Sequence, residues 1–187
     1  MDLQKMESGV RLVLEGLGRE HLPAEVWERT PRRVADMLAE LCAGIGEAPE
    51  NQLGSVFEES YDEMIALKDI PFHSLCEHHL LPFVGRAGVV YVPKAGRVAG
   101  ASKLARVVAV AAARPQLQER LTSQVADALM ERFNPHGVLV YVEAEHMCMS
   151  LRGVRSSGSR LVTSAIRGHL RTNAAAREEA LAIIRRS

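Results

Sequence analysis

The stretch that most constrains the fold of this chain is Cys76-Glu77-His78-His79, which gathers one thiol, one carboxylate and two imidazoles. A thiolate and an imidazole three positions apart can reach one metal ion across a tight turn. Two ligands do not complete a metal site. The chain is therefore predicted to fold so that a later segment meets this turn and supplies a further ligand.

The later segment that fits this requirement best is His146-Met147-Cys148. It lies near the end of a run, residues 138–149, whose β-branched and apolar composition predicts a strand. Residues two apart in a strand point to the same side, so the imidazole and the thiol of this segment are predicted to share a face.

Two kinds of zinc site are compatible with these residues. In a catalytic site, Cys76, His79 and Cys148 would provide three protein ligands and leave the fourth position open for water. In a closed structural site, His78 or His146 would be the fourth ligand. The spacing favours the catalytic site, but it does not decide which histidine binds the metal.

Length, charge and cysteine content narrow the class of protein. The 187 residues suffice for one domain with a hydrophobic core and a small helical appendage. Lys+Arg and Asp+Glu balance at 23 each, which argues against a general nucleic-acid binder. Three cysteines do not suggest a disulfide framework, and neither a membrane-spanning run nor a signal-peptide core is found. We therefore expect a cytoplasmic protein with no membrane association.

Hydrophobic periodicity predicts an α+β fold. Helices are predicted over residues 3–17, 30–44, 103–113, 116–133 and 174–186. Strands are predicted over residues 64–70, 86–93, 97–100, 138–149 and 159–166, with a loop over 71–82. The order of these elements predicts an antiparallel sheet with two helices on one face, and another subunit is one way to cover the second face. The domain prediction is an N-terminal helical appendage, 1–54, followed by a catalytic domain, 55–187.

Basic residues at a predicted helix start indicate an anion site. Ser102 is placed to cap the helix, and Lys103 and Arg106 share one face of its first turns, where free N–H groups also favour anions. Arg152 follows the metal-binding strand and could add charge, and Arg33 near the start of an earlier helix would suit a polyanion. The alternative is a solvated basic surface with no ligand.

The pair Gln118-Glu119 lies near the start of another predicted helix, where the dipole favours a carboxylate. A functional carboxylate here would suit a base that presents two N–H donors, such as guanine. The alternative is a helix-start glutamate that binds nothing.

Taken together, these segments resemble GTP cyclohydrolase I. The matching segments are residues 76–79, 100–106, 114–122 and 145–149, followed by Arg152-Gly153. Their order and spacing match the family over about residues 60–185, and residues 30–35 resemble its N-terminal helical motif. The resemblance implies the tunnelling fold and a homo-oligomer, a decamer of two pentamers, with active sites at subunit interfaces.

The resemblance also implies a reaction and a role for each site residue. GTP would be hydrolysed at C8 of guanine, with formate release and rearrangement to 7,8-dihydroneopterin triphosphate for folate or tetrahydrobiopterin synthesis. Zn²⁺ would be bound by Cys76, His79 and Cys148, with His78 and His146 transferring protons. The implied substrate contacts are Glu119 to guanine, Gln118 to the base or ribose, Ser102 to the ribose, Lys103, Arg106 and Arg152 to the triphosphate, and Arg33 from a neighbouring subunit.

Three departures from the family pattern leave room for a different function. Ala101 replaces a common Leu, Gly88 replaces a frequent His, and Gly168-His169-Leu170 replaces a more usual Gly-x-Phe. They are compatible with a relative that stops at a ring-opened or otherwise C8-altered intermediate. Competing hypotheses are a non-catalytic zinc-binding relative, a nitrile reductase of the queuosine pathway, which lacks this zinc triad, and a zinc-stabilised nucleic-acid module, which the charge balance disfavours.

Overall fold

The computed structural model describes residues 1–54 and 57–185 of the chain. Contacts between residues divide it into two compact units, Met1–Ala43 and Gly44–Ser187. The domain boundary predicted at residue 54 stays a prediction, and the last residue of the helix predicted over 174–186 lies outside the described residues.

The first unit pairs two helices joined by a short 3-10 turn: α1 (Leu3–Gly16), η1 (Arg19–His21) and α2 (Ala24–Leu41). The prediction that the second helix begins at Thr30 is wrong, because α2 starts earlier and continues through Pro31. Proline has no N–H, so the carbonyl of Trp27, four residues earlier, loses its intrahelical donor. The Arg11 guanidinium on α1 donates to this carbonyl at 3.3 Å, which compensates for the missing bond.

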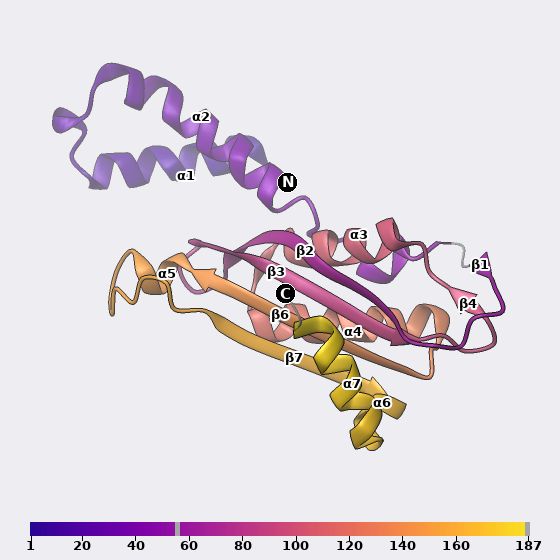
Figure 1. Ribbon diagram of the computed structural model, residues 1–187. Coiled ribbons are helices and arrows are strands. Elements are labelled where there is room, and N and C mark those ends of the chain that lie inside the picture. The colour runs from indigo at the N-terminus through magenta and orange to yellow at the C-terminus, as the bar shows by residue number, and fades with distance from the viewer. Residues whose placement is uncertain (55–56, 186–187) are drawn as a thin grey trace. The chain divides into compact units, whose positions relative to one another are not determined.

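The second unit is built on a five-stranded sheet of order β5-β2-β3-β6-β7. Figure 1 shows β2, β3, β6 and β7 side by side in this sheet. The strands are β2 (Ile65–Cys76), β3 (Pro82–Val92), β5 (Pro115–Gln116), β6 (Gly137–His146) and β7 (Leu161–Gly168). All neighbours are antiparallel except β2 and β5. The strand predicted over 97–100 is shorter in the structure, where β4 (Arg97–Val98) pairs with β1 (Phe57–Glu58) in a separate two-stranded sheet.

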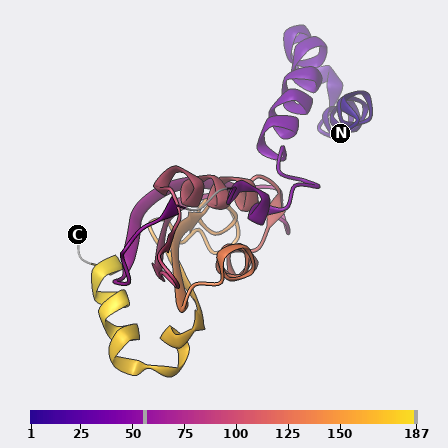
Figure 2. The ribbon, with the colours of Figure 1, turned by 90° about the vertical axis from the view of Figure 1, so that its right-hand side faces the viewer.

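Helices lie on both faces of the sheet (Figure 2). One face packs against α3 (Ala101–Ala112) and α4 (Gln118–Phe133), and the 3-10 turn η2 (Pro49–Gln52) contacts both helices. This layer buries most of the core, including Phe83, Val89, Tyr91, Val107, Leu121 and Leu129. None of the described helices is both long and apolar enough to cross a membrane.

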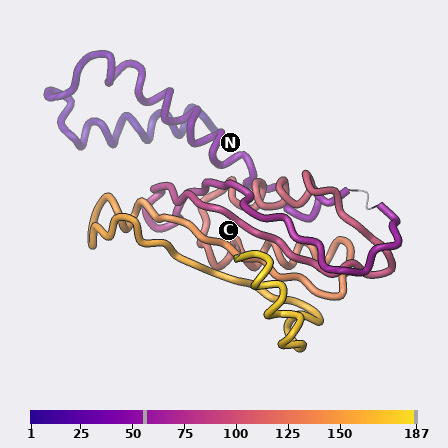
Figure 3. The backbone as a smooth tube through the Cα atoms, viewed as in Figure 1, coloured from indigo at the N-terminus to yellow at the C-terminus, as the bar shows by residue number. Residues whose placement is uncertain are grey.

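The opposite face is partly covered by the end of the chain, which returns after β7 through α6 (His169–Thr172) to α7 (Ala174–Arg185) (Figure 3). A second core forms there from Val90, Leu139, Leu170, Ala180 and Ile184. The α+β class is confirmed. The two helices predicted on one face are α3 and α4. The apolar side of α7 from the same chain covers part of the second face, for which another subunit was one expected cover.

The predicted loop over 71–82 is also wrong in its first half, because β2 runs through Pro71 to Cys76. Proline is tolerated in a strand where no ladder bond is required of its nitrogen. On its second side β2 pairs with β5 only at Leu75 and Cys76, so at Pro71 it is an edge strand. The extension places Cys76 at a strand end rather than within a loop.

Gly85 of β3 lies so close to β6 that an added methyl group would overlap the Glu143 carbonyl oxygen and approach the Ala144 Cα to 2.6 Å. We expect Gly85→Ala to lower the free energy of unfolding by about 1–3 kcal/mol, as overpacking does. Denaturant unfolding measures this change. Gly9→Ala in α1, where a Cβ meets nothing within 4 Å, is the control and should not destabilise. Equal unfolding free energies for wild type and Gly85→Ala would contradict this packing.

Candidate metal centre

Three side chains with metal-binding atoms meet at one end of the sheet. The ligand atoms of Cys76, His146 and Cys148 all lie within 4.8 Å of one another. Cys76 ends β2 and His146 ends β6, and β3 runs between these two strands. The register pairs Leu75 with Pro82 and His146 with Phe83, so both strand ends reach the same level of the sheet.

The third member of the cluster reaches it in an unexpected way. The prediction that His146 and Cys148 share a strand face is wrong, because the chain turns into the short helix α5 (Met147–Ser150) directly after β6. The Leu151 N–H donates to the Met147 carbonyl at 3.0 Å and closes this turn. A strand end followed by a helical turn, rather than an extended strand, therefore brings the thiol of Cys148 to Cys76.

The spacing and chemistry of these donors fit zinc. The sulfurs of Cys76 and Cys148 are 3.8 Å apart, and both residues are free thiols. Two sulfurs bound at about 2.3 Å to one tetrahedral zinc ion would also lie about 3.8 Å apart, whereas a disulfide needs about 2.05 Å. Burial raises the pKa of the Cys148 thiol, and its hydrogen bond with Cys76 raises that pKa further.

The two histidines of the 76–79 segment are exposed and lie on the turn that follows Cys76. The N–H of Leu80 donates to the carbonyl of Cys76 at 2.8 Å and closes the turn that carries them. His78 Nδ1 is 3.8 Å from the Cys76 sulfur, and His79 Nε2 is 3.5 Å from Arg152 Nη1. The structure thus gathers His146 with the two thiols, and the predicted ligand set that contains His79 stays a prediction.

The imidazole of His146 is held on two sides. The buried Phe83 ring stacks on it with centroids 4.5 Å apart and planes 3° from parallel. The Gln118 Oε1 atom lies 2.9 Å from its Nε2. Burial lowers the pKa of His146, and the nearby charge of Glu119 offsets part of this shift, so the neutral imidazole is favoured.

An ion pair joins the turn of the cluster to α4. Arg120 donates to the two carboxylate oxygens of Glu77 at 2.5 and 3.3 Å. The hydrogen bond from Arg120 is the main cause of the lowered pKa of Glu77. Sequence reasoning missed this pair and the contacts of His146 with Phe83 and Gln118. No spacing signal reveals them, because each joins elements that are distant in the sequence.

The predicted phosphate-binding residues Ser102, Lys103 and Arg106 lie in the first half of α3. Gly100, with no side-chain cap, precedes this helix, so the prediction that Ser102 caps it is wrong. The backbone turns into the helix two residues earlier than expected, which places Ser102 inside the first turn. The N–H groups of that turn therefore receive no side-chain cap from the N-cap position.

Within one chain, the start of α3 is distant from the metal cluster. The hydroxyl of Ser74, two residues before Cys76, donates to the carbonyl of Ala112 at the other end of α3 at 2.7 Å. At 1.5 Å per residue, Ser102 lies about 15 Å along the helix from that end. Arg33 belongs to the first unit, where it lies 3.6 Å from Glu25. The structure does not bring the basic residues at the start of α3 to the cluster of the same chain.

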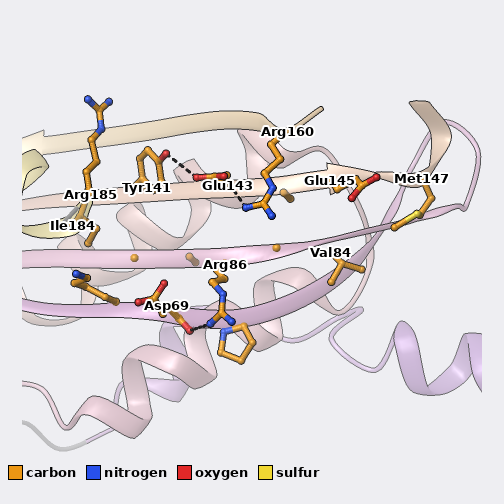
Figure 4. A pocket seen from close by; sticks show the side chains of 16 residues that line it. Asp69, Val84, Arg86, Tyr141, Glu143, Glu145, Met147, Arg160, Ile184 and Arg185 are labelled. Carbon is orange, nitrogen blue, oxygen red and sulfur yellow. Dashed lines mark hydrogen bonds and ion pairs between the residues drawn. The ribbon is translucent and has the colours of Figure 1, made fainter. Parts of the chain in front are cut away.

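A cavity of about 980 Å³ lies on the sheet face opposite α3 and α4 (Figure 4). Its walls come mainly from β2, β3, β6 and the end of α7, and several of its polar side chains contact one another. Arg160 binds Glu143 at 3.0 Å, the Tyr141 hydroxyl donates to the same carboxylate at 3.2 Å, and Arg86 donates to the Asp69 carbonyl. None of the predicted site residues lines this cavity, so it is separate from the metal cluster.

The fold and the cluster define an α+β protein with a thiol- and imidazole-lined candidate metal centre at the end of its sheet. The model of the family GTP cyclohydrolase I matches residues 6–185. The chain therefore belongs to the GTP cyclohydrolase I family of enzymes.

Two relatives agree with this assignment. A GTP cyclohydrolase 1 of Desulforamulus reducens is 56% identical over 186 residues, which cover 100% of this chain and 99% of the relative. A GTP cyclohydrolase 1 of Pelotomaculum thermopropionicum is 55% identical over 184 residues, 98% of this chain and 97% of the relative. A solved structure of the archaeosine synthase QueF-Like in the apo form is 18% identical and matches with a TM-score of 0.46, over 59% of this chain and 97% of that one.

Proposed function

We propose that this chain catalyses the zinc-dependent hydrolysis of GTP at C8 of guanine, with formate release and rearrangement to 7,8-dihydroneopterin triphosphate. The observation that carries the proposal is the cluster of Cys76, His146 and Cys148 in a chain of this family. The names of the relatives support GTP as the substrate. The tunnelling fold, a cytoplasmic location and a role in pterin or folate synthesis belong to the same proposal.

The residues that would hold the metal follow from the donors present. Cys76 and Cys148 would supply two thiolates. We assign the third ligand to His79, and His146, which lies with the two thiols, is the alternative. When bound, Zn²⁺ supplies a Lewis acid that activates water for attack on a weakly electrophilic ring carbon. Cys76 is buried, so water has little access to the sulfur of this thiolate.

Proton transfer is assigned to the two imidazoles at the cluster, His78 and His146. Protonation of guanine N7 by one imidazole withdraws electron density from C8 and favours the addition of water there. The other imidazole accepts the proton that the addition releases. His146 is held rigidly by Phe83 and Gln118, whereas His78 is exposed and lies 3.8 Å from the Cys76 sulfur.

Substrate binding is assigned to residues from more than one chain. Glu119, exposed in the first turn of α4, would accept hydrogen bonds from the N–H edge of guanine. The start of α3 would contact the ribose through Ser102 and, with Arg152, would hold the triphosphate through Lys103 and Arg106. Because the start of α3 lies about 15 Å from the end that adjoins the cluster, a neighbouring subunit is the natural source of these groups. This distance supports a homo-oligomer with interfacial sites. The oligomer we propose is a decamer of two pentamers, in which Arg33 of another chain would also reach the site.

The test is to mix the purified, zinc-analysed protein with GTP and to follow GTP loss, formate and pteridine together, identifying the product by mass. Formate with a dihydropterin triphosphate is expected. GTP loss without formate would favour a reaction that stops at a C8-altered intermediate. No GTP loss, with zinc bound and the oligomer intact, would overturn the proposal in favour of a non-catalytic relative.

Glu119→Gln should lower kcat/KM for GTP by about 10–100-fold, because a hydrogen bond to a charged group contributes about 1.5–3 kcal/mol. The amide presents a donor towards the N–H groups of guanine, so the loss should be mainly in KM. Steady-state kinetics measures it, and Glu131→Gln, an exposed glutamate farther along α4, is the control. Equal kcat and KM values for wild type and Glu119→Gln would contradict the assignment of Glu119 to guanine binding.

A further inference from the structure

Gln118, the first residue of α4, is a polar side chain with almost no solvent exposure, about 1%. Its Nε2 lies 3.1 Å from the Val142 carbonyl oxygen, 3.0 Å from the Leu161 carbonyl oxygen and 3.1 Å from Thr163 Oγ1. Its Oε1 lies 2.9 Å from Nε2 of His146. All its polar side-chain atoms are therefore engaged within the protein, directly beside the candidate metal centre.

The orientation of this amide follows from two of its partners. The carbonyl oxygens of Val142 and Leu161 can only accept hydrogen bonds, so they must face the NH₂ group of Gln118. If the Gln118 amide were flipped, its oxygen would face the two carbonyl oxygens, and no hydrogen would be available to bond them. The Oε1 atom must therefore point at His146, and an oxygen there can only accept.

The hydroxyl groups around Gln118 are consistent with this orientation. Thr122 Oγ1 lies 2.6 Å from the Gln118 backbone carbonyl, which only accepts, so the Thr122 hydroxyl donates there. The two threonine hydroxyls are 2.7 Å apart, and Thr163 must then donate to Thr122. With its hydrogen used in this way, Thr163 presents only an acceptor to the Gln118 NH₂ group, which is compatible with this orientation. The two N–H groups of the amide are then shared among three acceptors.

We propose that Gln118 is a positioning residue that holds His146 as the tautomer protonated at Nε2, leaving Nδ1 as its one atom able to accept a proton or bind a metal ion. Phe83 fixes the plane of the ring by stacking, and Gln118 fixes which nitrogen carries the hydrogen. This role differs from the predicted contact of Gln118 with the base or ribose of GTP. The tautomer is independent of the proposed function, and only its effect on GTP turnover rests on that function.

The direct test is solid-state ¹⁵N spectroscopy of the whole, metal-loaded protein labelled at histidine. His146 is assigned by the signals that disappear in His146→Asn. We expect a directly bonded proton on its Nε2 and none on its Nδ1. A proton on Nδ1, or a mixture of both tautomers in the wild type, would overturn the proposal, and this experiment requires no variant of Gln118.

A matched pair of variants tests the part played by Gln118. Gln118→Met keeps the length of the side chain but removes the acceptor, and it should produce a mixture of the two His146 tautomers. Gln116→Met is the control, since Gln116 is equally buried and donates to the Ala111 carbonyl and to Gln124 instead. It should leave the tautomer unchanged. An unchanged tautomer in a folded Gln118→Met variant would overturn the role of Gln118.

Turnover distinguishes a positioning residue from one that binds the base. In Gln118→Met, kcat for GTP should fall by about 10–100-fold, as losses of a supporting hydrogen bond do. KM should change by less than about twofold, because no substrate contact is removed. A rise in KM with unchanged kcat would show that Gln118 contacts the substrate, and it would overturn its role as a positioning residue. If the wild type shows the Nε2 tautomer but does not consume GTP, the proposed function fails and the tautomer assignment stands.

Discussion

Cys148→Ala is expected to lose bound zinc and all formate release from GTP. The Cys76 and Cys148 sulfurs are 3.8 Å apart, the separation that one tetrahedral zinc ion requires. Removing one thiolate leaves too few ligands for tight binding. The fold should change little, because Cys148 is only half-buried and lies in the short helix α5. Zinc content per chain by elemental analysis, measured beside formate release, checks this outcome.

Cys42→Ala provides the matched control for this substitution. Cys42 is a buried thiol at the end of α2 in the first unit, and burial raises its pKa, as expected for a neutral core thiol. This variant should keep the zinc content of the wild type. A Cys148→Ala protein that retains one zinc ion per chain would contradict the assignment of Cys148 as a ligand.

The second large effect separates the two candidate imidazole ligands. His79→Ala should lose zinc and turnover together, whereas His146→Ala should keep zinc and lose the pteridine product. The reason is that a ligand is needed to hold the metal, whereas a proton-transfer residue is needed only for the chemistry. Zinc analysis and GTP turnover of both variants, made side by side, provide the measurement.

The opposite pattern is equally informative about the site. The structure places His146, rather than His79, with the two thiols. If His146→Ala loses zinc while His79→Ala keeps it, then His146 is the ligand and His79 belongs to the surface that faces Arg152. That result would overturn the proposed ligand set and establish His146 as the third ligand.

The sequence predicted the α+β class and the meeting of two distant segments, because both depend on local periodicity and on the chemistry of rare residue types. The proximity of Cys76 and Cys148 was predicted because a metal ion needs more than two ligands. The backbone conformation that brings Cys148 there was not predicted, since the helix α5 replaces the expected strand end. The strand-like composition of residues 138–149 does not show where their pairing with β3 ends. The last pair is His146 with Phe83, so the end is set by the register between the two strands.

The surroundings of the site were harder to predict than its ligands. Gln118 gives no periodic signal that distinguishes a buried amide from one that contacts substrate. The four partners of its side chain come from β6 and β7, so they are set by sheet register. The continuation of α2 through Pro31 was missed for a similar reason, because the compensating donor, Arg11, lies on another helix.

The bond between Arg11 and the Trp27 carbonyl makes the two helices of the first unit mutually dependent. In isolation, α2 would leave the Trp27 carbonyl to water and would carry a proline that resists helix propagation. The Arg11 side chain from α1 therefore stabilises the middle of α2, where the backbone lacks one hydrogen bond. The two helices are therefore expected to order together rather than one after the other, and the pair acts as a single cooperative segment of the chain.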